Sequence, residues 1–299
     1  MLSLHTNAAS LSAQNSVSST QNKLSTSMTR LSTGFRINSA MDDAAGLQIA
    51  TRLKAQTSGM SVAMRNTQNS ISMLQTAEGA LDETGNILLR MKDLATQAAD
   101  GSSSKDDQTA MQAEYDSLAD ELTNIMKNTK FGGTSLLNQN TGKLSSSITF
   151  QIGADKAETM AGNFTTELTS VHTKLTATSA RYQGGTAAAG TAVGTDISGA
   201  TEAAGATNAN TTIDDLSQAI DSVSALRSKI GAVSNRLDHV YNNLSNISTN
   251  TQNATGRIMD VDFATESAKM TSSQMLMQAG TAMLKQTNQM SSMVMSLLQ

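Results

Sequence analysis

The sequence predicts a mainly α-helical protein. We expect a long antiparallel helical rod, packed like a coiled coil, with a small β-hairpin region and the two termini paired at one end. Large apolar residues recur three, four or seven positions apart through most of the 299 residues, the spacing of one helix face. Proline, which breaks helices, is absent. Aromatic residues make up only 3% of the chain, too few to fill a wide globular interior.

Composition also excludes several classes of function. The net charge of −4 and the lack of a basic stripe argue against a protein that binds nucleic acid. Without cysteine there is no disulfide or metal thiolate, and no apolar run reaches the roughly 20 residues that span a bilayer. The first lysine is Lys23, so a cleaved signal peptide is not expected. The three histidines, at positions 5, 172 and 239, lack ligand spacing and are expected at the surface or in an interface.

The first predicted segment, residues 1–40, is a terminal helix with an apolar stripe. The stripe consists of Val17, Leu24, Met28 and Leu31, the two-position seam of a coiled coil. It stops at Gly34, and Ser39 with Asp42 three residues later predicts a capping box for the next helix.

Residues 41–175 are predicted to form rod helices followed by the β-hairpin. The long helix that begins there keeps a seven-residue register at Leu53, Met60, Leu74, Leu81 and Leu88. A loop at 100–104 separates it from a third helix that ends near Phe131. Apolar residues then alternate at 148, 150 and 152, and residues from about 144 to 175 are expected to form a hairpin or small sheet.

The remaining chain should return along the rod. Residues 176–211 are rich in Gly, Ala, Thr and Asn, and predict a variable, surface-exposed insertion that tolerates replacement. Residues 212–256 predict the returning rod helix, starting after Thr212 and broken near Gly256. Residues 257–299 predict a C-terminal helix that pairs with residues 1–40.

That last helix is apolar where chain ends are usually polar. Its stripe consists of Leu276, Met277, Met283, Leu284, Met290 and Leu297. One partner helix can bury only part of this surface, too little to offset the conformational entropy of ordering it. We therefore expect the stripes of both terminal helices to make contacts between subunits of a polymer. Methionine suits contacts that must adapt between slightly different packings.

At these termini the sequence resembles the bacterial flagellins. The motifs that carry the resemblance are RLSTGFRINSA at 30–40, DDAAG at 42–46, DFATE at 262–266, QAGT at 278–281 and SLL at 296–298. The final helix departs from the family in lacking a proline, and the middle insertion is short. The opening residues 4–7 and the methionine-rich helices are more similar to lateral, swarming-type flagellins than to polar ones.

The resemblance implies an extracellular filament subunit for swimming or swarming, with the terminal helices as its inner core. It would be exported uncleaved through the flagellar type III apparatus with an export chaperone. Its partners would be its own copies, the filament cap protein and the hook–filament junction proteins. Arg90, Leu94 and Glu114 match family positions that contact the immune receptor Toll-like receptor 5; a role in subunit packing alone is equally open. From the charge and the lack of a long apolar run, neither a membrane nor a nucleic-acid partner is expected.

Other classes of protein fit less well. A hook–filament junction protein shares the terminal helices, but its middle region should be larger. A chemoreceptor signalling domain would need a helical hairpin tip at mid-chain, where this sequence is strand-like. No catalytic, cofactor-binding or metal-binding residues are expected, and the acidic pair Asp260 and Asp262 is better explained by helix capping.

Overall fold

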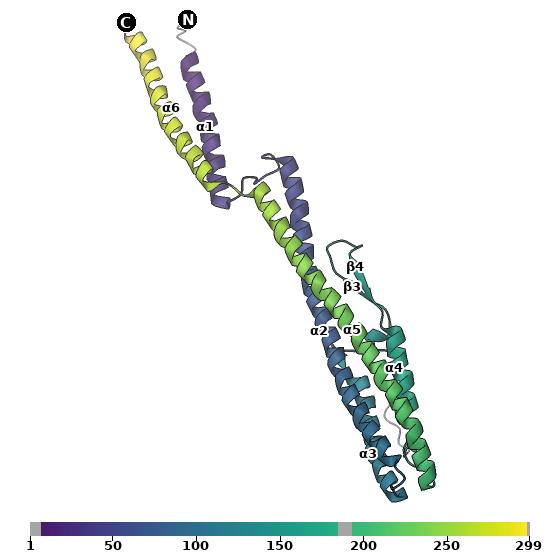
Figure 1. Ribbon diagram of the computed structural model, residues 1–299. Helices are drawn as coiled ribbons and strands as arrows, with labels where there is room; N and C mark the ends of the chain where they lie inside the picture. Colours follow the sequence, from purple (N-terminus) through teal and green to yellow (C-terminus); the bar gives the residue numbers. More distant parts are fainter. Residues whose placement is uncertain (1–6, 185–192, 298–299) are drawn as a thin grey trace. The chain divides into compact units, whose positions relative to one another are not determined.

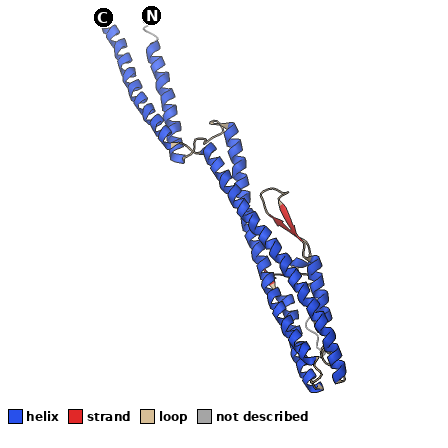
Figure 2. Ribbon diagram, viewed as in Figure 1, coloured by secondary structure: helices blue, strands red, loops and turns tan. Residues whose placement is uncertain are grey.

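The computed structural model describes residues 7–184 and 193–297, with side chains described as far as residue 289. Within these residues the chain is mainly α-helical and carries two short antiparallel strand pairs (Figures 1 and 2). The elements are α1 Ala8–Thr33, α2 Ala44–Ala98, α3 Lys105–Asn128, β1 Lys130–Phe131, β2 Thr134–Ser135, the 3-10 helix η1 Lys143–Ser145, β3 Ile148–Gln151, β4 Thr159–Gly162, α4 Thr165–Thr178, α5 Glu202–Met259 and α6 Phe263–Leu297. The mainly α fold with its small hairpin is confirmed.

The chain divides into two compact units. The terminal unit comprises Met1–Thr57 and Ser248–Gln299, and the central unit comprises Ser58–Ile247. The helices α2 and α5 contribute residues to both units.

In the terminal unit, α1 and α6 lie side by side and antiparallel, so that the start of α1 and the end of α6 lie at the same end of the pair (Figure 1). The side chain of Asn7 caps α1 by accepting from the amide of Ser10 at 3.1 Å. Gly34 ends the helix at φ 76°, a left-handed conformation that glycine adopts without a Cβ clash. The predicted pairing of the two terminal helices is therefore confirmed.

The start of α2 differs in detail from the predicted capping box. Asp42 accepts from the amides of Asn38 and Ser39, at 3.1 and 2.9 Å, and so tightens the turn before the helix. The helix begins only at Ala44, and the carboxylate of Asp43 accepts from the amide of Gly46 at 2.8 Å. Asp43 is the capping residue, because its side chain satisfies an amide of the first turn.

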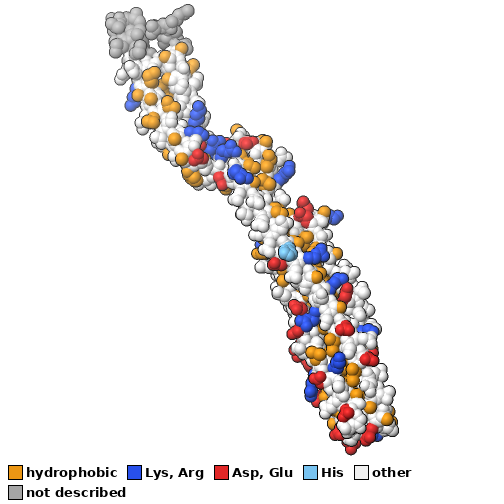
Figure 3. Space-filling model, viewed as in Figure 1, with side chains coloured by type: hydrophobic (Ala, Val, Ile, Leu, Met, Phe, Trp, Pro, Cys, Tyr) orange, Lys and Arg blue, Asp and Glu red, His pale blue; other side chains and the backbone are white. Residues whose placement is uncertain are grey.

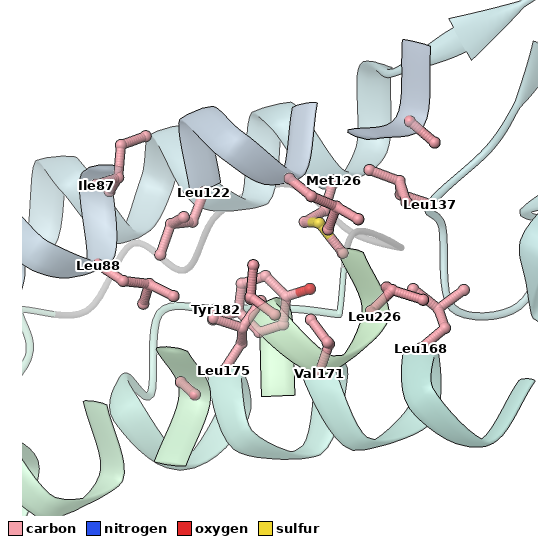
Figure 4. Close-up of a cluster of buried hydrophobic side chains, with 14 of the residues drawn as sticks. Ile87, Leu88, Leu122, Met126, Leu137, Leu168, Val171, Leu175, Tyr182 and Leu226 are labelled. Atoms are coloured by element: carbon pink, nitrogen blue, oxygen red, sulfur yellow. The ribbon is translucent and has the colours of Figure 1, made fainter. Parts of the chain in front are cut away.

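The central unit buries a large apolar core among α2, α3, α4 and α5 (Figure 4). A second, smaller cluster of Met60, Ala63 and Leu244 lies between α2 and α5. The predicted register of α2 is confirmed there, since Leu74, Leu81 and Leu88 are each 0% exposed. Arg227 of α5 reaches Asp82 of α2 at 2.9 Å across the outer edge of this packing.

The predicted sheet region contains a hairpin but also a helix. Strands β3 and β4 pair antiparallel, with Phe150 opposite Met160, as the alternation of apolar residues predicted. The extension of the sheet to residue 175 was wrong, because Thr165–Thr178 forms α4. Its buried side chains Leu168, Val171 and Leu175 follow three- and four-residue steps, a helical period obscured by the many β-branched threonines around them.

The predicted insertion, residues 176–211, is only partly a surface loop. Tyr182 and Ile197 are 2% and 0% exposed and belong to the core, so exposure of the whole segment was wrong. Polar side chains of α3 hold the segment: Gln112 accepts from the amide of Ile197 at 2.7 Å, and Asp116 accepts from that of Gly194 at 3.0 Å. Residues 185–192 of the insertion lie outside the described residues.

The returning helix is longer than predicted at both ends. It begins at Glu202 and ends at Met259, so neither the start after Thr212 nor the break near Gly256 is correct. The break falls instead at residues 260–262, before α6.

His172 was predicted at a surface or interface but is 1% exposed. Its Nε2 lies 2.8 Å from the carbonyl of Leu137, which can only accept, so Nε2 donates. Its Nδ1 then accepts from the hydroxyl of Tyr182 at 2.6 Å. Burial holds the pKa of His172 below its ordinary value, and the ring is neutral. His239 is exposed, and His5 lies outside the described residues.

Candidate subunit interface

The apolar side chains of the two terminal helices are incompletely covered. Val17, Leu24, Leu31, Met277 and Leu284 are half-buried. Met28, Leu276 and Met283 remain 53%, 59% and 60% exposed. The side chains of Met290 and Leu297 lie outside the described residues. Figure 3 shows hydrophobic side chains scattered over the visible face of these helices.

Sequence reasoning missed two further exposed apolar residues of these helices, Leu11 of α1 and Met275 of α6, which are 55% and 61% exposed. Their large apolar side chains were a usable signal, but neither fell on the seven-residue stripe that was followed.

Buried side chains in this helix pair are polar. Ser27 is the buried residue of α1, and Glu266 is buried in the described part of α6. The central unit, by contrast, buries large apolar residues on every helix. Among the described side chains of this helix pair no large apolar residue is fully buried, so these residues form no apolar core of their own.

A polar contact fixes how the two terminal helices meet. The hydroxyl of Ser27 donates to Glu266 at 2.6 Å, while Lys269 approaches the same carboxylate at 3.4 Å and Arg30 lies at 4.0 Å. The hydrogen bond from Ser27, with the neighbouring cations, lowers the pKa of Glu266. A buried polar contact of this kind specifies register at some expense of stability.

One glycine lets the helices approach closely. A Cβ placed on Gly280 of α6 would lie 2.6 Å from the Cγ2 atom of Val17 on α1. A larger residue at this position would therefore push the two helices apart or displace the valine.

The three residues matched to an immune-receptor contact do not share one surface. The guanidinium of Arg90 donates to Glu114 from Nε at 3.0 Å and from Nη2 at 2.6 Å, and both side chains are about half exposed. Leu94 is 3% exposed and lies in the core of the central unit. The spacing of Arg90 and Leu94 had suggested that they share one exposed helix face. The structure shows instead that Arg90 is exposed and Leu94 is buried.

The described residues show no feature of a membrane span or metal centre. No described helix has a stretch both long and apolar enough to cross a bilayer. Among the same residues, His, Cys, Asp and Glu form no group of three or more that could hold a metal ion.

The fold is that of a helical protein whose paired terminal helices leave large apolar side chains exposed. Two family models match the chain: the bacterial flagellin N-terminal helical region over residues 4–141, and the bacterial flagellin C-terminal helical region over residues 213–298. The chain belongs to the bacterial flagellins.

Similar proteins include flagellins of two Vibrio species. The chain is 46% identical to flagellin C of Vibrio cholerae over 162 residues, which are 54% of this chain and 42% of that protein. It is 48% identical to polar flagellin F of Vibrio parahaemolyticus over 157 residues, which are 52% of this chain and 41% of that protein. The matches thus span about two fifths of the length of these relatives. The resemblance to lateral flagellins stays a prediction.

A solved structure described as a flagellar hook-associated protein from Vibrio parahaemolyticus has a similar fold. The TM-score is 0.52 at 16% identity, covering 73% of this chain and 100% of that one. At this identity the likeness concerns the fold alone.

Proposed function

We propose that this chain is the structural subunit of an extracellular flagellar filament used for swimming or swarming. The observation that carries the proposal is the contrast between the two units. The central unit packs a complete core, whereas α1 and α6 leave large apolar side chains exposed around a polar contact. Identical neighbours are the simplest cover for a surface that every copy exposes in the same way.

The exposed side chains give this association its strength. Covering the exposed half of Met28, Leu276 or Met283 would contribute about 1 kcal/mol for each. Every subunit would make such contacts with several neighbours, so small contributions would add up along a filament. Residues 1–40 and 257–299 are proposed as the inner core, and residues 41–175 and 212–256 as the surrounding rod.

The wider set of partners follows from membership of the flagellin family. We expect contacts with the filament cap protein and the hook–filament junction proteins. Export would proceed through the flagellar type III apparatus with its chaperone and without a cleaved signal peptide. For Toll-like receptor 5, the exposed pair Arg90 and Glu114 supports a contact surface, while the burial of Leu94 restricts that residue to packing.

A hook–filament junction protein remains the alternative, and it is favoured only by the similarity in fold described above. The two rivals differ in what the purified chain forms. A filament subunit forms long helical filaments visible by electron microscopy, whereas a junction protein forms none.

Deletion of residues 277–299 tests the assignment of the terminal helix. The truncated chain should not sediment under conditions where the full-length chain forms filaments. Its central unit should melt, by circular dichroism, at the temperature of the full-length monomer, because the deleted residues contribute nothing to the central core. Filaments of the truncated chain would contradict the assignment.

A matched pair of substitutions separates the apolar surface from the helix itself. Leu276 and Gln274 are both exposed on α6, and each can be changed to serine. Leu276→Ser should weaken polymerisation, whereas Gln274→Ser should leave it unchanged. Equal effects of the two would mean that the helix matters but its apolar side chains do not.

A further inference from the structure

Met41 is the most exposed large apolar residue among those described, at 97%. It lies in the turn between α1 and α2, within the terminal unit. At this exposure its side chain has almost no contact with its own chain. An apolar side chain held out in this way gains free energy only when something else covers it.

The turn that carries Met41 is firmly held. The carboxylate of Asp42 accepts from the amides of Asn38 and Ser39 and lies 3.5 Å from Arg30. Before this turn, Ile37 is 2% exposed and anchors the segment. A rigid turn loses little conformational entropy on binding, which favours Met41 as an interface anchor.

The terminal unit also has an apolar groove. It lies between the first turns of α2 and the last turns of α5, and has a volume of about 440 Å³. Apolar side chains from three segments line it, namely Phe35, Leu47, Ala50 and Met259, with Thr51 and Lys54 beside them. Phe35 is 44% exposed, so part of this lining is open to solvent.

The two residues that follow Met41 are acidic, Asp42 being also paired with Arg30, and the residues beside the groove are mainly basic. Two carboxylates, Asp42 and Asp43, directly follow Met41. At the groove, Lys54 is among the lining residues, and Arg52 and Arg257 each adjoin a lining residue in the chain. These three cations are exposed and pair with no carboxylate among the described residues. Asp260 is the acidic residue of the lining.

We infer that Met41 of one copy inserts into the groove of a neighbouring copy, with its two aspartates facing Lys54 and the adjoining arginines. The occupant is a second copy, because the same chain carries both the apolar anchor with acidic neighbours and the apolar groove with basic ones. Such a contact joins different patches of two copies, the head-to-tail kind that builds open helical polymers. The inference rests on the proposed filament function and assigns one of its contacts.

Cysteine cross-linking tests the contact cleanly, since the chain contains no cysteine. Two single variants, Met41→Cys and Thr51→Cys, are mixed in equal amounts, polymerised and oxidised with a copper catalyst in air. Disulfide-linked dimers should appear in the mixed filaments and not in filaments of Thr51→Cys alone. Met41→Cys mixed with Ser117→Cys, an exposed position on α3, is the matched control and should give no dimers.

Filaments that form without dimers would overturn the inference and leave the filament function intact. Failure of the unmodified chain to form filaments would instead overturn the filament function itself. If Thr51→Cys alone blocks assembly, Lys54→Cys replaces it in the same groove. As a second measurement, Met41→Asp should raise the critical concentration for polymerisation about tenfold, with Met41→Leu changing it by less than about twofold. Equal critical concentrations for these two variants would contradict the contact.

Discussion

Replacing Leu94 or Arg90 by alanine should affect the central unit very differently, although the two residues are one helical turn apart. Leu94 is 3% exposed within the core, and a buried leucine changed to alanine costs about 2–5 kcal/mol through lost burial and a cavity. Arg90 and Glu114 are 55% and 48% exposed, and such a surface ion pair contributes about 0–1 kcal/mol.

Thermal unfolding of the full-length monomer, followed by circular dichroism, measures the difference. For a unit of this size, about 1 kcal/mol shifts the melting temperature by roughly 2–4 °C. Leu94→Ala should therefore lower the melting temperature by about 5–15 °C, and Arg90→Ala by less than about 4 °C. Leu89→Ala is the control, because Leu89 lies on the same helix but is 53% exposed; its melting temperature should stay close to that of the unmodified chain.

The same variants decide how any change in receptor activation is interpreted. If Arg90 contacts Toll-like receptor 5, Arg90→Ala should weaken signalling by soluble monomer at an almost unchanged melting temperature. Loss of signalling by Leu94→Ala should come together with loss of stability. A stable Leu94→Ala variant, or an Arg90→Ala variant as destabilised as a core mutant, would refute the assignment of these residues to core and surface.

Three further outcomes are expected. Gly280→Val should reduce filament formation, measured by sedimentation, because its added atoms would overlap Val17. The melting of the central unit, measured by circular dichroism, should not change, because both residues belong to the terminal unit. Tyr182→Ala and Ile197→Ala should each lower the free energy of unfolding by about 2–5 kcal/mol in urea denaturation. Unchanged stability of both variants would contradict their place in the core and support a surface loop. Burial lowers the pKa of His172. The contribution of the neutral ring to stability is therefore fully present above the ordinary histidine pKa of about 6.5 and declines as the pH falls below it. The decline occurs because the unfolded chain then binds a proton that the folded chain resists. The free energy of unfolding of His172→Gln, measured by urea titration from pH 7.5 to 5, should lack this pH dependence. If the free energy of unfolding falls equally steeply with pH in the variant and the unmodified chain, the neutral buried ring is contradicted.

The long helices could be predicted from the sequence because their apolar spacing persists over many turns. The residues Leu74, Leu81 and Leu88 were placed on the buried face of α2 by spacing alone, and the hairpin followed from the alternation around Phe150. Short elements were harder. The helix α4 is 14 residues long, and its few apolar positions were outweighed by threonines whose propensity favours strands.

The candidate interface was predicted in outline and decided in detail by the structure. Spacing identified the stripes of both terminal helices, but it could not tell which side chains face the partner helix and which face away. Val17 is half-buried at Gly280, whereas Leu276 and Met283 stay exposed. Spacing also missed Met41, which lies in a turn with no period to reveal it.

The sequence by itself determined the helical class, the paired termini and, through its terminal motifs, the family. These features depend on local periodicity and on contiguous residues, both of which can be read along a single chain. Only the tertiary structure decided that Leu94 and His172 are buried, that Tyr182 and Ile197 of the insertion join the core, and that Met41 is exposed. Burial at one position depends on which distant segment packs over it. A hydrogen bond such as that from the amide of Ile197 to the side chain of Gln112 can hold a polar loop against a core that the composition of the loop does not predict.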